Sequence, residues 1–226
     1  MQNNISFIRT LLITILGAIF IAVLYSLMVG VGKDDIKFSL VLNHTFKNNL
    51  GLTISNYIGI IFASKNWLVI MIITGLLGLF GIKKNTDLKK NILWFSVSLL
   101  ICAVATESLK IIVGRYRPFA YFNDHPITAH FKHFCIKDNA CHSAPSGHTG
   151  FSFAALYCLS KIFNKWWLGL FFALLACIIA CSRIITLNHY LSDVIFGAYI
   201  GVISVFWANW IINKLYNKTK KPQKIK

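Results

Sequence analysis

The chain carries, at residues 182–193, the stretch Ser182-Arg-Ile-Ile-Thr-Leu-Asn-His189-Tyr-Leu-Ser-Asp193. It places an arginine, a histidine and an aspartate between two long apolar runs. Ionisable side chains at membrane depth are energetically expensive, and they mark a functional site. His189 and Asp193 are four residues apart, so on one helix they share a face, and we expect the carboxylate to hold the imidazole. Holding the ring in one tautomer suits a nucleophile or a base.

The composition is that of a membrane protein. Of the 226 residues, 56% are hydrophobic and only 13% are charged, whereas a soluble domain is about 25% charged. A chain this apolar covers its surface only if much of that surface faces lipid. We therefore expect a single integral membrane domain over residues 1–226, with an interfacial segment at 33–65 and a basic tail at 214–226.

Apolar runs predict six transmembrane helices, each able to cross about 30 Å of hydrocarbon. Their expected bounds are 10–32, 66–82, 91–113, 146–163, 166–185 and 189–212. Between the first two, Phe38, Val41 and Leu42 recur at helical spacing among polar residues, which predicts an amphipathic helix on the membrane surface. The predicted fold is an all-α, polytopic membrane helical bundle.

The net charge of +16 comes mainly from lysines that flank the apolar runs, at 83–90 and at 214–226. The positive-inside rule places such segments, and hence both termini, in the cytoplasm. The loop at 115–144 and the turn at 185–189 then share the opposite face, with every candidate catalytic residue. A basic groove interleaved with aromatic side chains is missing, which argues against nucleic acid as a partner. The oligomeric state is not readable from the sequence.

Two cysteines, Cys135 and Cys141, share the polar loop. In an oxidising compartment they would form a disulfide. A zinc site that uses them with His133 or His142 is the alternative. Otherwise we expect the loop histidines at positions 125, 130, 133 and 142 to be solvated, with His142 as the first candidate for an exception because it is near the helix cap.

A second polar constellation ends the third predicted span: Lys110-Ile-Ile-Val-Gly-Arg-Tyr-Arg117-Pro118. Pro118 turns the chain away from the helix. Taken alone, this segment has a simpler interpretation: the side chains of Lys110 and Arg117 extend from the membrane boundary toward water. Glu107 lies three residues before Lys110 on a similar helix face, and we expect it to orient the lysine. A role in the substrate pocket is the alternative. Arg115 is expected at the lipid headgroups or the membrane surface.

A third constellation, Pro145-Ser146-Gly147-His148, opens the fourth predicted span. Proline followed by serine is typical of a helix entrance, with Ser146 at the N-cap. The unpaired N–H groups there form a natural anion site, and Gly147 lets the backbone approach a phosphate closely. His148 lies in the first turn, at the rim of that site. The alternative is a capped helix with an incidental histidine.

Together these segments resemble the type-2 phosphatidic-acid-phosphatase superfamily, which is itself similar to vanadium haloperoxidases and acid phosphatases. The shared pattern is Lys-x6-Arg-Pro, Pro-Ser-Gly-His and Ser-Arg-x5-His-x3-Asp, and every position is filled in order. The resemblance covers about residues 93–201, the expected catalytic core.

The resemblance implies a hydrolase that works through a phosphohistidine. His189, oriented by Asp193, would attack phosphorus, while His148 would protonate the leaving oxygen and then activate water. The phosphate-binding groups would be Lys110, Arg117, Arg183, Ser146 and Gly147. Because the cations do the work of a metal ion, we expect no metal and no cofactor.

The implied substrate is a lipid phosphate monoester or pyrophosphate: phosphatidylglycerophosphate, phosphatidate or undecaprenyl pyrophosphate, with lipid A as an alternative. Specificity should reside in residues 33–65 and 115–144. The expected location is a bacterial inner membrane, with the site facing the periplasm. From another class, the alternative is a non-catalytic lipid-binding or transport protein with the same fold.

Overall fold

The computed structural model describes residues 2–27, 34–82, 86–123 and 131–219. Within these ranges the regular structure is helical, and the only extended pairing is an isolated bridge between Arg115 and Phe131. The elements in order are α1 (Gln2–Tyr25), α2 (Asp34–Phe46), α3 (Asn49–Ile61), α4 (Ser64–Leu76), the π-helical turn η2 (Leu77–Gly81), α5 (Thr86–Val113), α6 (Pro118–Asn123), the 3₁₀ turn η3 (Asn139–Cys141), α7 (Gly147–Phe163), α8 (Trp166–Ile185) and α9 (Leu191–Thr219).

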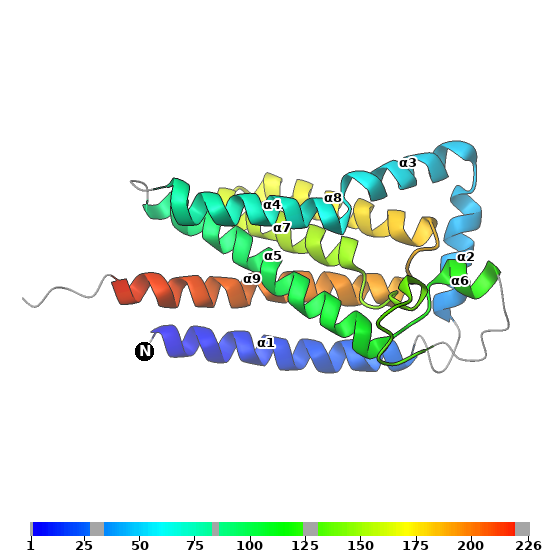
Figure 1. Cartoon of the computed structure of the whole chain (residues 1–226), viewed down its shortest axis with the longest axis horizontal. Coiled ribbons are helices and arrows are strands. Elements are labelled where there is room, and N and C mark those ends of the chain that lie inside the picture. Colours follow the sequence, from blue (N-terminus) through cyan, green and yellow to red (C-terminus); the bar gives the residue numbers. More distant parts are fainter. Residues whose placement is uncertain (1, 28–33, 83–85, 124–130, 220–226) are drawn as a thin grey trace, which may run out of the picture.

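The long helices run side by side along the longest axis of the molecule, and α2 lies across one end (Figure 1). In the described part of the chain, five helical segments are long and apolar enough to cross a membrane: 6–24, 50–81, 86–113, 166–185 and 191–217. Much of their apolar surface is exposed, as at Leu16, Phe20 and Leu174. An exposed apolar surface of this extent requires lipid around it. The chain is therefore a multi-pass membrane protein.

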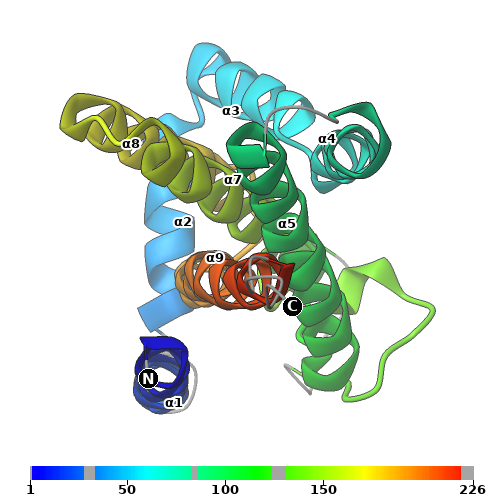
Figure 2. The same ribbon diagram turned by 90° about the vertical axis from the view of Figure 1, so that its left-hand side faces the viewer.

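Helix α7 has 17 residues and lies in the middle of the bundle, against α5, α8 and α9 (Figure 2). It contacts α9 at close range because glycines line the interface. A Cβ added at Gly201 would lie 2.3 Å from the Gly150 carbonyl oxygen, and one added at Gly197 would lie 2.4 Å from the Ser146 oxygen. Small residues allow such backbone approach between membrane helices. The packing holds the first turn of α7 against the first turns of α9.

Helix α2 forms within the predicted amphipathic segment, and its apolar residues Phe38, Val41 and Phe46 are exposed. The interfacial location of residues 33–65 stays a prediction. The face of α2 that packs on the protein is a polar stripe: Asp35 and Ser39 are buried, and Asn43, four residues further on, is half-buried. Asn43 Nδ2 donates a 2.6 Å hydrogen bond to the Ile185 carbonyl at the end of α8. The stripe points inward because the ends of α8 and α9 offer hydrogen-bonding partners that lipid cannot supply.

Helix bounds agree best where the apolar run is continuous. The span predicted at 166–185 is α8, residue for residue. Helix α1 instead starts at Gln2, before the predicted residue 10, and α9 continues to Thr219.

Candidate active site

Four segments distant in sequence meet at the end of the bundle that carries α2 (Figure 1). They are the last turn of α5 with the loop after it, the start of α7, the end of α8 and the turn before α9. Arg117 Nη1 donates to Asn188 Oδ1 at 3.3 Å, and the His189 ring bonds the Ser143 carbonyl at 2.7 Å. The prediction that the loop at 115–144 and the turn at 185–189 share one face is therefore confirmed.

The N-terminus of α7 forms one side of the site. Ser146 is its N-cap, as predicted, but the Ser146 side chain makes no capping hydrogen bond. Its backbone N–H donates to the Asp193 carbonyl at 3.0 Å, which joins the start of α7 to the start of α9. A Cβ added at Gly147 would lie 3.1 Å from Lys110 Nζ. Glycine thus lets a cation approach a helix N-terminus, where anions bind.

The three predicted phosphate-binding cations come from separate segments. Lys110 pairs with Glu107 at 2.6 Å, as its spacing predicted, and its side chain is 12% exposed. Arg117 Nε donates to the Asn139 carbonyl at 3.1 Å. Arg183 is 7% exposed, and its buried Nε has no hydrogen-bond partner among the described residues. A buried donor without a partner is costly, so an anion at this point would stabilise the site.

Helix α3 covers this cluster. A Cβ added at Gly59 would lie only 2.0 Å from Arg183 Nη1. The backbone of Gly59 also forms a hydrogen bond with the His148 ring. Gly59 thus touches two candidate functional residues at once. Sequence reasoning missed it, because a glycine inside an apolar run carries no signal of its tertiary neighbours.

His189 is 1% exposed, and its Nδ1 lies 2.7 Å from the Ser143 carbonyl oxygen. A carbonyl oxygen only accepts hydrogen bonds, so Nδ1 carries the proton and the lone pair resides on Nε2. Burial lowers the pKa of His189 well below its ordinary value, and the charges of Arg117, Arg183, His148 and Lys110 lower it further. The ring is therefore neutral at neutral pH, with Nε2 in its nucleophilic form.

The expected helical pairing of His189 with Asp193 is wrong in its geometry. Helix α9 begins at Leu191, and His189 belongs to the preceding turn, in which Leu187 has a φ of 52°. The Ser143 carbonyl orients the imidazole, and Asp193 holds Ser143 by accepting its Oγ–H at 2.5 Å. The same carboxylate accepts the Tyr190 N–H at 3.0 Å. It thus binds the start of its own helix, as acidic residues in a first turn do.

The expectation for Arg115 is also wrong. The side chain is 3% exposed instead of lying at the headgroups. It donates to Asp193 at 2.6 Å and to Asp35 of α2 at 2.9 Å. Two carboxylates from distant segments compensate one buried cation, which makes its burial possible. Neither Asp35 nor Ser143 carries a motif that would have revealed its place beside the site.

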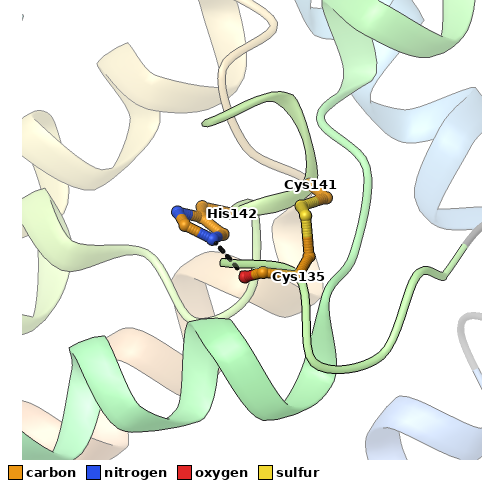
Figure 3. Close-up of side chains that lie close together, drawn as sticks. All are labelled: Cys135, Cys141 and His142. Atoms are coloured by element: carbon orange, nitrogen blue, oxygen red, sulfur yellow. Dashed lines mark hydrogen bonds between the residues drawn. A yellow bond between two sulfur atoms is a disulfide. The ribbon is translucent and has the colours of Figure 1, made fainter. Parts of the chain in front are cut away.

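Cys135 and Cys141 form a disulfide (Figure 3). The zinc alternative fails, because each sulfur is already bonded to the other. His142 lies beside them and contacts the Cys135 carbonyl at 2.8 Å, while His133 is exposed. The disulfide closes the loop whose Asn139 and Ala140 carbonyls hold Arg117. The histidines at 125 and 130 lie outside the described residues.

With this geometry in place, the similarity to known proteins is specific. The sequence profile of the PAP2 superfamily matches residues 91–217, more than half of the chain, and the chain belongs to this superfamily. Lipid phosphate phosphatase 1 of Arabidopsis thaliana is 35% identical over 141 residues, covering 52% of this chain and 43% of that protein. Probable lipid phosphate phosphatase 4 of the same plant is 34% identical over 140 residues, covering 51% and 46%. Each match spans less than half of the relative's length.

Solved structures share the fold. LpxE of Aquifex aeolicus superposes with a TM-score of 0.56 at 21% identity, covering 76% of this chain and 92% of that one. A PAP2-type phosphatidylglycerolphosphate phosphatase of Bacillus subtilis superposes with a TM-score of 0.57 at 21% identity, covering 91% and 96%. At this identity the likeness establishes the bundle architecture alone.

Proposed function

We propose that the chain is a membrane lipid phosphatase that hydrolyses a lipid phosphate monoester or pyrophosphate through a phosphohistidine at His189. One observation carries the proposal: a buried, neutral imidazole with its lone pair on Nε2 lies within the field of three cations from three segments. The names of the plant relatives support a lipid as the carrier of the phosphate.

Phosphate binding falls to the cations and to the start of α7. Lys110, Arg117 and Arg183 neutralise the phosphoryl oxygens, on which negative charge spreads in the transition state. The N–H groups of the first turn, beginning with Gly147, and the Ser146 hydroxyl donate further hydrogen bonds. These donors are held before substrate arrives, so little reorganisation accompanies the reaction.

In the first step, the Nε2 lone pair of His189 forms a bond to phosphorus. The bond between phosphorus and the lipid oxygen breaks, and His148, as imidazolium, transfers its proton to that oxygen. The products are a lipid alcohol, or a lipid monophosphate from a pyrophosphate, and phosphohistidine. Phosphate in the site favours the imidazolium form of His148, because its charge offsets the neighbouring cations.

In the second step, neutral His148 accepts a proton from water, and the oxygen of that water attacks phosphorus. The bond between phosphorus and Nε2 breaks, and inorganic phosphate leaves. His189 is again neutral and His148 again protonated, so the cycle closes without a net change in either residue.

We propose that no metal ion takes part. The three cations supply the charge that Mg²⁺ supplies in other phosphatases. The buried carboxylates of Asp35 and Asp193 already accept hydrogen bonds from Arg115, so a divalent cation would have to displace an arginine.

For the substrate, we propose phosphatidylglycerophosphate, phosphatidate or undecaprenyl pyrophosphate, with lipid A phosphate as the alternative. All four combine a phosphate with apolar tails that stay in lipid while the headgroup enters the site.

We propose six spans, with α7 as the additional one, and both termini in the cytoplasm of a bacterium. The N-terminal end of α1 and the C-terminal end of α9 lie at the same end of the bundle, opposite the α2 end (Figure 1). The start of α5, which carries Lys89 and Lys90, lies at that end too (Figure 1), which supports a cytoplasmic assignment. The catalytic end would then face the periplasm.

The decisive experiment measures phosphate release from these four lipids by the purified protein in detergent with EDTA. We expect wild-type activity to persist with EDTA, and His189→Ala to lose at least about 10³-fold in rate because the nucleophile is gone. Acid-labile, base-stable phosphate on the wild type would identify the phosphohistidine. If His189→Ala retains the wild-type rate, the assignment fails. If no lipid is hydrolysed, a non-catalytic lipid-binding or transport role takes its place, and bromide oxidation with added vanadate would indicate a haloperoxidase.

A further inference from the structure

Asp35 lies outside the three motifs, on α2, and is 1% exposed. Both of its carboxylate oxygens are engaged. Oδ2 accepts from Arg115 Nη2 at 2.9 Å and from the Ser192 hydroxyl, and Oδ1 accepts from the Ser192 N–H at 3.0 Å. A carboxylate this deeply buried and this completely paired is fixed in one position.

Arg115 joins Asp35 to the first turn of α9. Its Nη1 donates to Asp193 Oδ1 at 2.6 Å and to the Ser192 hydroxyl at 2.7 Å. Its guanidinium carbon lies 3.9 Å from the ring centroid of Tyr190, the residue that follows His189. The order of charges is therefore carboxylate, guanidinium, carboxylate, all buried.

The chain of contacts continues to His189 through Ser143. Asp193 Oδ2 accepts from the Ser143 hydroxyl, and the Ser143 carbonyl accepts from His189 Nδ1. The Ser143 N–H donates to the Arg115 carbonyl at 2.9 Å, so Arg115 holds Ser143 from a second side. Whatever fixes Arg115 and Asp193 thus also fixes the carbonyl that selects the tautomer of His189.

We propose that Asp35 is a positioning residue of the phosphatase: it orients His189 through Arg115, Asp193 and Ser143. This inference rests on the proposed function. Without the Asp35 charge, Arg115 retains one carboxylate partner in a buried site, and it shifts toward Asp193 or toward water. Either shift moves Ser143, and with it the ring nitrogen that must be aligned with phosphorus. The side chains of the three phosphate-binding cations make none of the hydrogen bonds in this series, so we expect substrate binding to be preserved.

The test compares Asp35→Asn with Asp34→Asn. The neighbouring Asp34 is a matched control, because its side chain is 72% exposed and, among the described residues, pairs with Lys37 at 3.9 Å. Asparagine keeps the shape and one acceptor oxygen but removes the charge. We expect Asp35→Asn to lower kcat about 10- to 100-fold, as small misplacements of a reacting group do. KM and inhibition by orthovanadate should stay unchanged, and Asp34→Asn should match wild type.

Ser192→Ala is a second variant, which removes a hydroxyl shared by Asp35 and Arg115 without changing any charge. It should lower kcat in the same direction but less, again at constant KM. If the wild type is active and Asp35→Asn has the same kcat as Asp34→Asn, the positioning role is overturned and the proposed function stands. The positioning role is also overturned if Asp35→Asn and Ser192→Ala each lose kcat, vanadate inhibition and folded protein to the same extent. Such a result would mean that Asp35 only anchors α2. A wild type that hydrolyses no lipid phosphate overturns the proposed function and this inference together.

Discussion

The cations of this protein occupy two contrasting regions. Three of its four arginines gather at the catalytic end, where Arg115 and Arg183 are at most 7% exposed. Lysines dominate the opposite end, and there they meet aromatic rings and carbonyls. Lys161 lies 5.2 Å from the Tyr157 ring centroid, Lys214 lies 4.7 Å from that of Trp210, and Lys89 Nζ is 3.5 Å from the Leu79 carbonyl.

The contrast shows that net charge alone says little about this chain. Exposed lysines stay hydrated and interact with the membrane surface as point charges. Buried arginines keep a planar fork of donors in place for carboxylates or phosphate. The two regions also differ in what mutation would do, and this difference is testable.

Within this comparison, the largest expected effect separates the two regions directly. Arg183→Lys keeps the charge but loses the planar fork, so we expect kcat/KM for lipid phosphate hydrolysis to fall about 100-fold. Lys161→Ala, at the other end of α7, should match wild type. An Arg183→Lys enzyme as active as wild type would mean that charge alone matters at the site, and the contrast between arginine and lysine would lose its meaning.

A smaller effect should follow from crowding Arg183 without replacing it. Gly59→Ala puts a Cβ 2.0 Å from the present position of Arg183 Nη1, so the guanidinium must move. We expect a loss in kcat/KM of about 10-fold with the folded protein intact. Gly169→Ala on α8 is the control, because a Cβ added there would lie 4.0 Å from the Ser160 Cβ, which is ordinary van der Waals contact. Equal activities of the two variants would show that α3 does not restrain Arg183.

The smallest effect concerns stability and pH. Burial and then the nearby cations lower the pKa of His189 in the folded protein, whereas the unfolded residue titrates near about 6.5. As pH falls below about 6.5, the unfolded chain binds a proton that the folded chain does not, so stability falls by up to about 1.4 kcal/mol per pH unit. Thermal unfolding in detergent should therefore be less sensitive to acid in His189→Gln than in wild type. If the unfolding temperatures of the two proteins fall in parallel with pH, other groups cause the acid sensitivity.

Much of the architecture was predictable from the chain itself. The uninterrupted apolar run at 166–185 is α8, and the Pro-Ser-Gly-His segment begins α7 at Gly147 with Ser146 as its N-cap. The Glu107–Lys110 pair followed from its spacing of three residues on one helix. These features depend on neighbours in sequence, and local patterns report them well.

Long-range pairing was predicted less well. The spacing of four residues suggested that Asp193 holds His189 on a helix, but the α9 N-terminus begins two residues after His189. Residues before a helix start do not share its faces. The polar stripe of α2 was likewise visible, yet its periodicity did not say that the stripe faces protein.

The sequence by itself determined the class of fold, the membrane setting and the residues that gather at the catalytic end, because hydrophobic length, helix starts and motif order are all local properties. The tertiary structure alone decided which charge meets which: Arg115 with Asp35 and Asp193, His189 with Ser143, Arg183 beneath Gly59. The physical reason is that a buried charge requires a partner within a few ångströms, and here the partner comes from a segment far away along the chain, brought close only by helix packing.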